Sequence, residues 1–359
     1  MNPLITQFKQ QLDPVLEHYL DQKIRQQDNI LVKQMYSVLK DFTMRSGKRI
    51  RASITYHGYA CIADIPKKKE KDLLFASGAI EIIQSYLLIH DDIIDRDVLR
   101  RGGPTVHTFY QRLFKEMLND HKHARALDQH LGTSFAILIG DLANGLAQDI
   151  ILNSRFPDKA KTLAAEAMNS LTLEVVHGQA LDIVAEIDRN LTEEDVLKIQ
   201  GLKTAKYTVE APFMIGAILA GANEQQKKTI SAFSKPLGQA FQIQDDILGM
   251  FGNEAETGKS AMSDLKEGKM TLLIVKALEK ANPKEKKIIL TALGNCALTP
   301  AEHAAVKRIV QSTGSLDYSK KLAKKLCNQA YAILKQGNFR REGVDFIRTI
   351  GECIVNRTT

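Results

Sequence analysis

The chain has 359 residues, of which 44% are hydrophobic and 25% are charged. This composition is typical of a soluble globular protein, and we expect no membrane-spanning segment because no stretch approaches the ~20 uncharged apolar residues that one needs. The net charge of +7 suits nucleic acid, anionic lipid or phosphorylated small molecules and does not choose among them.

We expect one continuous domain over residues 1–359. Its 9 Pro and 22 Gly are scattered, and no Pro- or Ser-rich stretch resembles a linker. The first twenty residues mix polar and apolar side chains, unlike a secretion signal, so a cytoplasmic protein is expected. The four cysteines form no CxxC pair, and we interpret them as idle or buried thiols.

Apolar residues recur with helical spacing wherever the chain is readable. Stripes over residues 15–24 and 31–42 are followed by longer apolar-rich segments at 73–94, 131–152, 160–185, 194–220, 230–250 and 270–278. Gly, Pro and Asn interrupt the pattern at 102–104, 156–157, 221–223 and 282–283. The sequence therefore predicts an all-α bundle of roughly ten or more helices joined by short loops.

Two stretches are expected to be loops. The lysine-rich run from Pro66 to Asp72 is interpreted as a solvated loop between helices. The stretch over residues 252–269 is rich in Gly and charge and is long for a connector, and such loops often bind ligands.

A first acidic cluster, Asp91, Asp92 and Asp95, follows a nearly uncharged helical stretch. On a helix, Asp91 and Asp95 lie one turn apart on the same face. These carboxylates repel one another, and Mg²⁺ is a natural compensation because it binds carboxylates while keeping positions for water and substrate phosphate. Taken alone, such a string is as often a solvated helix end.

A second acidic cluster, Asp245 and Asp246, ends another long apolar-rich stretch and is preceded by Gln242. Charged residues follow in the next loop: Lys259, Asp264 and Lys269. Two acidic helix ends that face each other across a bundle would hold several Mg²⁺ ions, which a diphosphate would bridge.

Basic side chains accompany both clusters. Arg100 and Arg101 follow the first cluster, and arginine forks match phosphate oxygens with paired hydrogen bonds. Further basic points are Lys48, Arg49, Arg51, Lys203, Lys259 and Lys269. Each alone is usually a solvated residue, but the set predicts two diphosphate sites, one bridged by metal and one held by Lys and Arg.

Two such sites imply a reaction. A diphosphate clamped by Mg²⁺ and cations is a good leaving group because its developing charge is already balanced. If it leaves an allylic carbon, the remaining carbocation is shielded from water by an apolar bundle, and the alkene of a second substrate attacks it. No Ser-His-Asp or Cys-His constellation is discernible.

Several motifs follow one another in a characteristic order: SGKRIR, DDIID with RRGGPTVH, GTSFAILIGDLA, KTA, FQIQDDILGMFG, TGK and EGKMTLL. Over roughly two thirds of the chain this order resembles the trans-isoprenyl diphosphate synthases, the polyprenyl synthetase family. The resemblance implies an all-α prenyl synthase bundle (isoprenoid synthase type I) around a central cavity, usually homodimeric. It implies a prenyltransferase with three Mg²⁺ ions that joins dimethylallyl, geranyl or farnesyl diphosphate head to tail to isopentenyl diphosphate.

The resemblance also assigns roles at matching positions. Magnesium ligation falls on Asp91, Asp92, Asp95, Asp245 and Asp246. The allylic diphosphate is assigned to Arg100, Lys203, Lys259 and Lys269, and isopentenyl diphosphate to Lys48, Arg51, Arg101 and the residue at position 84. Cation stabilisation is assigned to Lys203 (through its carbonyl), Thr204 and Gln242, and the released pyrophosphate takes the final proton.

Two positions depart from the family pattern. Gln84 stands three residues after Glu81, where the family commonly has His, so a hydrogen-bond donor without charge replaces an isopentenyl diphosphate ligand. Gly249 stands where many members have a third Asp in the second motif, and Asp264 is expected to supply that carboxylate.

Product length is predicted from Tyr86 and Leu87, which lie five and four positions before Asp91. One bulky ring at the fifth position, without an insertion in DDIID, resembles geranylgeranyl synthases and predicts a twenty-carbon product. A farnesyl or longer-chain synthase is the alternative, and Tyr86 as an ordinary core residue is the simpler interpretation.

Three other functions stay open at this point. A terpene cyclase shares metal-assisted ionisation but needs one diphosphate site, so turnover without isopentenyl diphosphate would identify it. A non-catalytic subunit of a heteromeric synthase would be inert alone, although such subunits typically lose the aspartate clusters. Only the net charge favours a nucleic-acid binder. We expect no nucleic-acid binding, because no interleaving of basic and aromatic residues and no nucleic-acid-binding motif is discernible.

Overall fold

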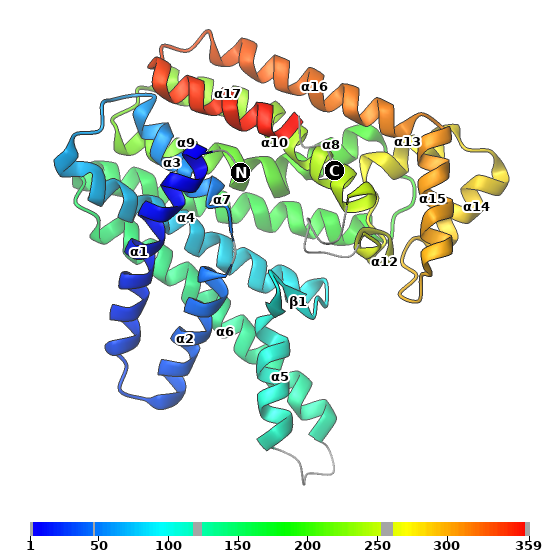
Figure 1. Ribbon diagram of the computed structural model, residues 1–359, viewed down its shortest axis with the longest axis horizontal. Coiled ribbons are helices and arrows are strands. Elements are labelled where there is room, and N and C mark those ends of the chain that lie inside the picture. The colour runs from blue at the N-terminus through cyan, green and yellow to red at the C-terminus, as the bar shows by residue number, and fades with distance from the viewer. Residues whose placement is uncertain (1–2, 46, 118–123, 253–260, 356–359) are drawn as a thin grey trace. The chain divides into compact units, whose positions relative to one another are not determined.

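The structure is a computed structural model that describes residues 3–45, 47–117, 124–252 and 261–355, the side chains of 124–126 and 353–355 excepted (Figure 1). Helices dominate these residues, and the strands among them are two short ones of two residues each. The predicted all-α fold is thereby confirmed.

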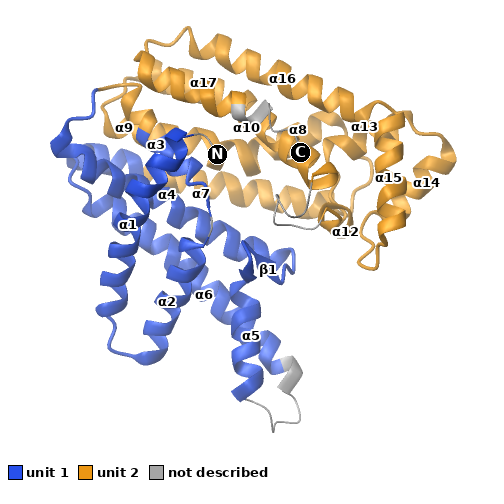
Figure 2. Cartoon of the chain, viewed as in Figure 1, with its two compact units in different colours: residues 1–56, 64–165 blue, residues 57–63, 166–359 orange. Residues whose placement is uncertain are grey.

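The backbone divides into two compact units, which Figure 2 distinguishes by colour. Unit 1 comprises residues 1–56 and 64–165, and unit 2 comprises residues 57–63 and 166–359. The expectation of a single continuous domain stays a prediction.

Unit 1 is a helical unit with one hairpin. Its elements are α1 (Pro3–Arg25), α2 (Ile30–Met44), most of α3 (Ile50–Ala60), α4 (Lys67–Ile94), β1 (Leu99–Arg100), β2 (Gly103–Pro104), α5 (Val106–Met117), α6 (Ala124–Asn153) and the first turns of α7 (Asp158–Ala185). α4 is its core helix and packs mainly against α6 and α1. Gly78 permits the α1 contact, because a Cβ there would lie 2.6 Å from Leu16 Cδ2.

The Gly-Gly-Pro break predicted after the first acidic cluster is a tight hairpin. β1 and β2 pair antiparallel, with Leu99 opposite Pro104 and Arg100 opposite Gly103. The two turn residues, Arg101 and Gly102, have φ of 52° and 75°, as a type I′ turn requires of both central residues. Arg101 is therefore held in a left-handed conformation that a non-glycine residue rarely adopts.

Unit 2 contains the remaining elements. They are the rest of α3 and α7, then α8 (Glu193–Gln200), η1 (Gly201–Glu210), α9 (Ala211–Leu219), α10 (Glu224–Phe251), α12 (Ser263–Glu267), α13 (Leu272–Lys280), α14 (Pro283–Ala292), α15 (Pro300–Ser312), α16 (Ser315–Leu334) and α17 (Arg341–Val355). α10 is the core helix of this unit and packs against η1, α16 and α17.

Helix starts in unit 2 follow local chemistry. Asn223, Asn282 and Thr299 are N-caps of α10, α14 and α15, and each forms a capping box with the side chain three residues later. Such caps satisfy backbone N–H groups that the first helical turn leaves unpaired. Pro283 and Pro300 occupy the first helical position, where the missing N–H costs nothing.

The sequence predicted one helix over residues 194–220, but the structure divides it into α8, the π-helix η1 and α9. Two glycines let neighbouring helices approach η1 closely. A Cβ at Gly178 of α7 would lie 2.6 Å from the Lys203 backbone nitrogen, and one at Gly238 of α10 would overlap Ala205. π-Helical turns are rare and frequently lie at functional sites. The side chains of η1 are therefore candidates for a functional site.

The predicted loop from Pro66 to Asp72 is wrong for all but its first residue. α4 begins at Lys67, with Pro66 as its N-cap residue in an extended conformation. Lys and Glu are good helix formers, and these residues stay solvated on the first turns of the helix. Solvation was predicted correctly, but it does not distinguish a loop from an exposed helical turn.

Two helical segments have the length and apolar composition to cross a membrane, namely α4 and residues 127–153 of α6. In the most apolar window of α4, 72% of the residues are buried in the protein, and in that of α6, 44%. Core helices of globular proteins meet the same criteria, so length and composition alone are weak evidence for a span.

The described cysteine side chains are free thiols. Cys61 and Cys327 are buried and Cys296 is exposed. Burial raises the pKa of Cys327 to about 11, so this thiol stays protonated and unreactive at neutral pH. These three residues fit the interpretation of the cysteines as idle thiols.

Gly238→Ala is expected to lower the free energy of unfolding by about 1–3 kcal/mol, because its methyl group meets the backbone of Ala205, which cannot move aside. Thermal unfolding followed by circular dichroism measures the effect. Gly145→Ala is the control, because nothing lies within 4 Å of the Cβ position there, and helical Gly→Ala raises stability by about 0.5–1 kcal/mol. Equal midpoints for the two variants would contradict this packing argument.

Candidate active site

The first acidic cluster lies at the C-terminal end of α4. Asp91 and Asp92 are in the last turn, and Asp95 is the C-cap, whose backbone N–H donates to the carbonyl of Asp91. This end of a helix carries partial negative charge, so carboxylates there are unfavourable unless cations compensate them. The cluster therefore needs positive charge close by.

Arg100 supplies part of that charge. Its Nε donates to Asp92 Oδ1 at 2.6 Å, and its Nη2 contacts the same oxygen and lies 2.9 Å from Asp97 and 3.8 Å from Asp91. Asp92 is fully buried, and its burial raises its pKa to about 7 although Arg100 acts to lower it. Asp92 thus anchors Arg100, while Asp91 and Asp95 are partly exposed.

A second cationic group lies in the same unit around Gln84 of α4. With the amide oriented to suit its neighbours, Gln84 Oε1 accepts from Arg51 Nη1 at 2.9 Å and from Arg101 Nη2 at 3.0 Å. Burial lowers the pKa of Arg101, and Arg49 and Arg51 act in the same direction while Glu81 opposes them. Like charges held this closely favour an anion between them. We name Arg51, Gln84 and Arg101 the arginine cluster.

Arg49 supports the arginine cluster from inside the core. It is 2% exposed and has a left-handed φ of 54°. Its Nε donates to Asp13 at 2.7 Å, and its Nη1 donates to the carbonyl of Thr43 at 2.8 Å and to Glu81 at 3.3 Å. Backbone strain of this kind persists where surrounding contacts impose it, often at functional sites. Lys48, its neighbour, is exposed.

Tyr86 packs against His90, a neighbour on the same helix, α4. It is buried, and its ring packs edge-on against His90, with centroids 4.9 Å and ring planes 78° apart. The His90 ring lies directly against Gly140 of α6, where any side chain would overlap it. Leu87 is half-buried beside them. The Tyr86 ring thus contacts a histidine that is itself packed against α6.

In unit 2, Lys203 extends from η1 to α7. Its Nζ donates to Asp182 Oδ2 at 2.6 Å. Burial and the nearby Asp182 raise the pKa of Glu186, while Lys269 and Lys203 act to lower it. Lys203 and Lys269 therefore both lie within electrostatic reach of Glu186.

Thr204 and Gln242 belong to one hydrogen-bonded chain. Thr204 Oγ1 donates to Gln242 Oε1 at 2.7 Å, and Gln242 Nε2 donates to Asp246 Oδ1 at 2.7 Å. Gln200 Nε2 donates to Asp246 Oδ2 at 3.0 Å. Both carboxylate oxygens of Asp246 thus bind protein amides, and burial raises its pKa well above the ordinary range. Asp246 fixes Gln242, which in turn fixes Thr204.

Asp245 is exposed next to this chain, and Asp264 lies close to the position of the missing third aspartate. A Cβ at Gly249 would lie 2.7 Å from Asp264 Oδ2. The absence of a side chain at Gly249 therefore makes room for the carboxylate of Asp264, as the sequence led us to expect. Lys269 pairs with Glu267. Lys259 lies outside the described residues.

The donor set suits Mg²⁺ and not a closed protein cage. Among the residues that the structure describes, no three His, Cys, Asp or Glu side chains converge into a preformed metal cluster. Mg²⁺ is typically bound by one or two carboxylates, with water and substrate phosphate completing its shell. The partly exposed Asp91 and Asp95, and the exposed Asp245, fit that mode of binding.

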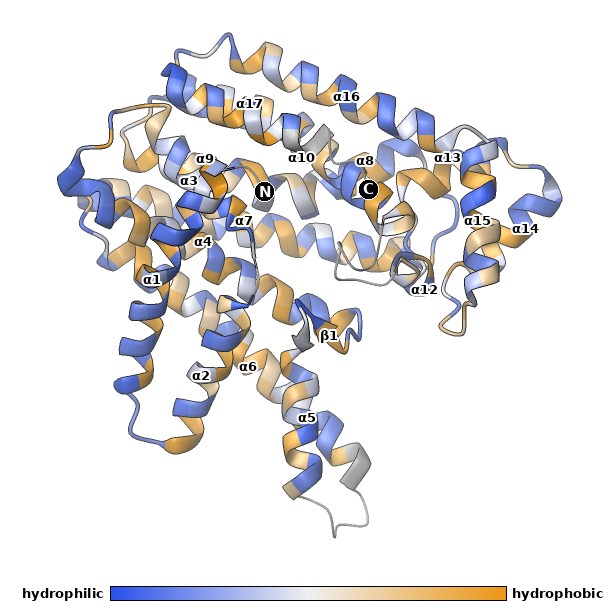
Figure 3. Ribbon diagram, viewed as in Figure 1, coloured by the Kyte–Doolittle hydropathy of each residue, from blue (hydrophilic) through white to orange (hydrophobic). Residues whose placement is uncertain are grey.

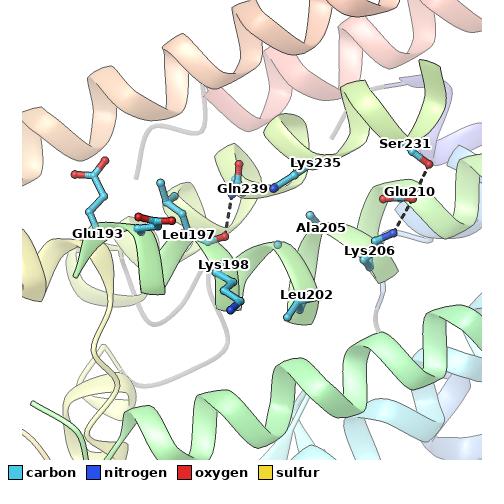
Figure 4. A pocket seen from close by; sticks show the side chains of 12 residues that line it. Glu193, Leu197, Lys198, Leu202, Ala205, Lys206, Glu210, Ser231, Lys235 and Gln239 are labelled. Carbon is cyan, nitrogen blue, oxygen red and sulfur yellow. Dashed lines mark hydrogen bonds and ion pairs between the residues drawn. The ribbon is translucent and has the colours of Figure 1, made fainter. Parts of the chain in front are cut away.

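A separate groove of about 920 Å³ lies between α8 and η1 on one side and α10 on the other (Figure 4). At one end, Lys206 and Ser231 both donate to Glu210 at 2.8 Å, and Gln239 donates to the carbonyl of Leu197 at 2.8 Å. Lys203, Thr204 and Gln242 are not among its lining residues. This groove is therefore distinct from the candidate active site.

Comparison with known protein families identifies the family of this chain. The family model described as polyprenyl synthetase matches residues 32–312. The chain belongs to the polyprenyl synthetase family. It is therefore a prenyltransferase of the all-helical isoprenoid synthase fold.

The chain is similar to known synthases over most of its length. This chain is 34% identical to a geranylgeranyl diphosphate synthase of Sulfolobus acidocaldarius, over 85% of both chains. It is 33% identical to a geranylfarnesyl diphosphate synthase of Aeropyrum pernix, over 81% of this chain and 83% of that one. A crystal structure of geranylgeranyl pyrophosphate synthase from Corynebacterium glutamicum, complexed with isoprenyl diphosphate and magnesium, matches with a TM-score of 0.88 and 30% identity, covering 98% and 99% of the chains.

Sequence reasoning missed several residues that position the synthase site. Asp182 partners Lys203, Gln200 partners Asp246, and Glu81 partners Arg49. Asp182 and Gln200 are ordinary polar residues of amphipathic helices, and no local spacing links them to their partners. Arg49 lies between Lys48 and Arg51 in one basic run, and nothing in the run itself marks it as the buried one.

Gln84→Glu is expected to weaken binding of inorganic pyrophosphate to the synthase by at least about tenfold and also to raise its melting temperature. The new carboxylate would pair with Arg51 and Arg101, which stabilises the buried arginines but occupies the anion position. Titration calorimetry and thermal unfolding measure the two effects. Gln84→Leu, which removes the oxygen, is expected to lower the melting temperature. If Gln84→Glu bound pyrophosphate as well as the wild type, Arg51 and Arg101 would not form an anion site.

Proposed function

We propose that the synthase condenses an allylic prenyl diphosphate with isopentenyl diphosphate and that its main product is geranylgeranyl diphosphate. The supporting observation is that unit 1 alone contains two different anion-binding arrangements. Asp91 and Asp95 suit a diphosphate bridged by metal, whereas Arg51 and Arg101 suit one without metal. A cyclase with a single diphosphate substrate has no use for the second arrangement.

Divalent metal is part of the proposal. Asp91, Asp95 and Asp245 would hold Mg²⁺, with Asp264 as a further carboxylate beside Gly249. When bound, Mg²⁺ would neutralise charge on the leaving diphosphate. We propose three ions by analogy with the family. The basic residues that would bind the same diphosphate are Arg100, Lys203, Lys259 and Lys269.

Residues of η1 and α10 would stabilise the allylic cation. Breaking the allylic C–O bond leaves its electron pair on the diphosphate and positive charge on the allyl group. Oxygen atoms of Thr204 and Gln242, with the carbonyl of Lys203, would face that charge. The alkene of isopentenyl diphosphate then forms the new C–C bond. Loss of a proton to the released pyrophosphate restores a double bond, so atoms and charge balance.

Product length is assigned to Tyr86 and Leu87. The ring of Tyr86 packs against His90, whose own ring lies against Gly140, so we expect Tyr86 to resist displacement by a growing prenyl tail. The relatives include synthases named for geranylgeranyl and for geranylfarnesyl products. We favour the shorter product because Tyr86 is bulky and firmly held.

A homodimer is also part of the proposal. α7 exposes Leu173, Val176 and Ile183, with exposed fractions between 38% and 62%, at the three- and seven-residue spacings of a heptad helix–helix seam. In unit 1, α6 exposes Ile137 in the same way. Contiguous exposed apolar side chains of this kind mark protein–protein interfaces, and a second copy of the synthase would cover them.

We place the synthase in the cytoplasm. Cys61, Cys296 and Cys327 are free thiols, and unpaired cysteines suit a reducing compartment.

The purified synthase is expected to form a prenyl product only with an allylic diphosphate, isopentenyl diphosphate and Mg²⁺ all present, and chelation by EDTA should abolish turnover. Asp91→Ala and Asp245→Ala are each expected to lower kcat/KM by about 10²-fold or more, because each removes a metal ligand that balances leaving-group charge. Radiolabelled isopentenyl diphosphate measures both effects.

The matched control is Asp158→Ala, on an exposed carboxylate in the first turn of α7, which should stay within about twofold of the wild type. Product from the allylic substrate alone would identify a cyclase, and an inert wild-type protein would indicate a non-catalytic subunit.

Tyr86→Ala is expected to shift the product distribution to chains longer than twenty carbons, because removal of the ring opens space in the path proposed for the prenyl tail. Mass spectrometry of the dephosphorylated products measures the distribution. Tyr86→Phe keeps the ring and should give the wild-type product. An unchanged distribution for Tyr86→Ala would show that Tyr86 is an ordinary core residue.

A further inference from the structure

The excess positive charge of the chain is confined to its last quarter. Residues 276–359 contain 16 Lys or Arg and 7 Asp or Glu, which gives a net charge of +9, whereas the whole chain carries +7. Residues 1–275 therefore carry −2. Such an asymmetry indicates that one region of a protein interacts with a charged partner.

Within this region, α16 carries four lysines on one side, in the turns that follow its single acidic residue, the exposed Asp317. Lys320, Lys321, Lys324 and Lys325 are all exposed, and none of them has an ion-pair partner within the described ranges. Positions i, i+1, i+4 and i+5 share one side of a helix. We name these four residues the α16 lysine face.

The opposite side of α16 is buried. It contributes Ala323, Leu326, Cys327 and Ala330 to the core, and α16 packs on α10, α13 and α17. Figure 3 shows hydrophilic and hydrophobic residues alternating along α16. The lysines are thus fixed by a helix whose other side is anchored in unit 2, and they do not belong to a loose tail.

We propose that the α16 lysine face docks the enzyme on an anionic membrane surface, with lipid phosphate headgroups as its ligand. Protein surfaces usually intersperse charges of both signs, and four neighbouring lysines without an ion-pair partner among the described residues depart from that rule. Each lysine near an anionic bilayer strengthens binding about fivefold. The benefit of docking rests on the proposed function, because a prenyl diphosphate is an amphiphile that partitions from water into a bilayer.

The side chains of this face favour lipid over nucleic acid. α16 contains no Arg, the residue that reads phosphate and base edges with a rigid fork. Its aromatic residues are engaged elsewhere, since the hydroxyl of Tyr318 donates to Glu193 and that of Tyr331 to the carbonyl of Arg348. Proteins that bind single strands without sequence preference stack bases on free aromatic rings.

Sedimentation of the full-length protein with vesicles tests the proposal. The wild type is expected to bind vesicles of phosphatidylcholine mixed with phosphatidylglycerol, to ignore vesicles of phosphatidylcholine alone, and to dissociate as salt is raised. The variant K320Q/K321Q/K324Q/K325Q is expected to bind at least about 100-fold more weakly. Circular dichroism confirms that each variant is folded.

The matched control K280Q/K284Q/K286Q/K287Q removes the same charge from exposed lysines at the end of α13 and on α14, and it should keep binding within about fivefold of the wild type. Equal losses in both variants, or no binding by the wild type, would overturn the proposal. A short DNA duplex that displaced the protein from vesicles at lower phosphate concentration than competing vesicles would assign the face to nucleic acid instead. Prenyl transfer without vesicles is scored separately, so failure of the proposed function and failure of docking are distinguishable.

Discussion

Carboxylates at the C-terminal end of a helix are opposed by one another and by the partial negative charge of the helix end itself. α4 ends on three of them, Asp91, Asp92 and Asp95. Arg100 draws Asp92 into a buried ion pair, and the other two carboxylates stay partly exposed. One carboxylate therefore positions a cation, and the two partly exposed ones are those that we propose as metal ligands.

The β1–β2 hairpin, which follows α4, supplies the cation that these carboxylates need. Arg100 and Arg101 are consecutive, yet one pairs with the carboxylates while the other meets Arg51 at Gln84. The left-handed φ of Arg101 in a two-residue turn makes this divergence possible. Burial and the neighbouring arginines lower the pKa of Arg101, and Glu81 acts against them. We therefore propose that a few residues at one helix end form two anion sites of different chemistry.

The sequence allowed the helical fold and most of the candidate site to be predicted, because helical periodicity and short acidic and basic motifs are local patterns. It did not reveal the π-helix η1, which requires close approach by Gly178 and Gly238 from two other helices. It also did not reveal the ion pair of Lys203 with Asp182, or that Arg49 is buried while Lys48 is exposed. These features depend on tertiary packing, and propensity and spacing carry no signal for them.

We propose that the two aspartate motifs hold one allylic diphosphate through shared metal ions. Anomalous scattering from crystals grown with Mn²⁺ and an unreactive thiolo analogue of an allylic diphosphate tests it most directly. We expect metal ions bound to Asp91 and Asp95 and to Asp245, all in contact with the same diphosphate. Metal ions bound at the two motifs but touching no common diphosphate would contradict it.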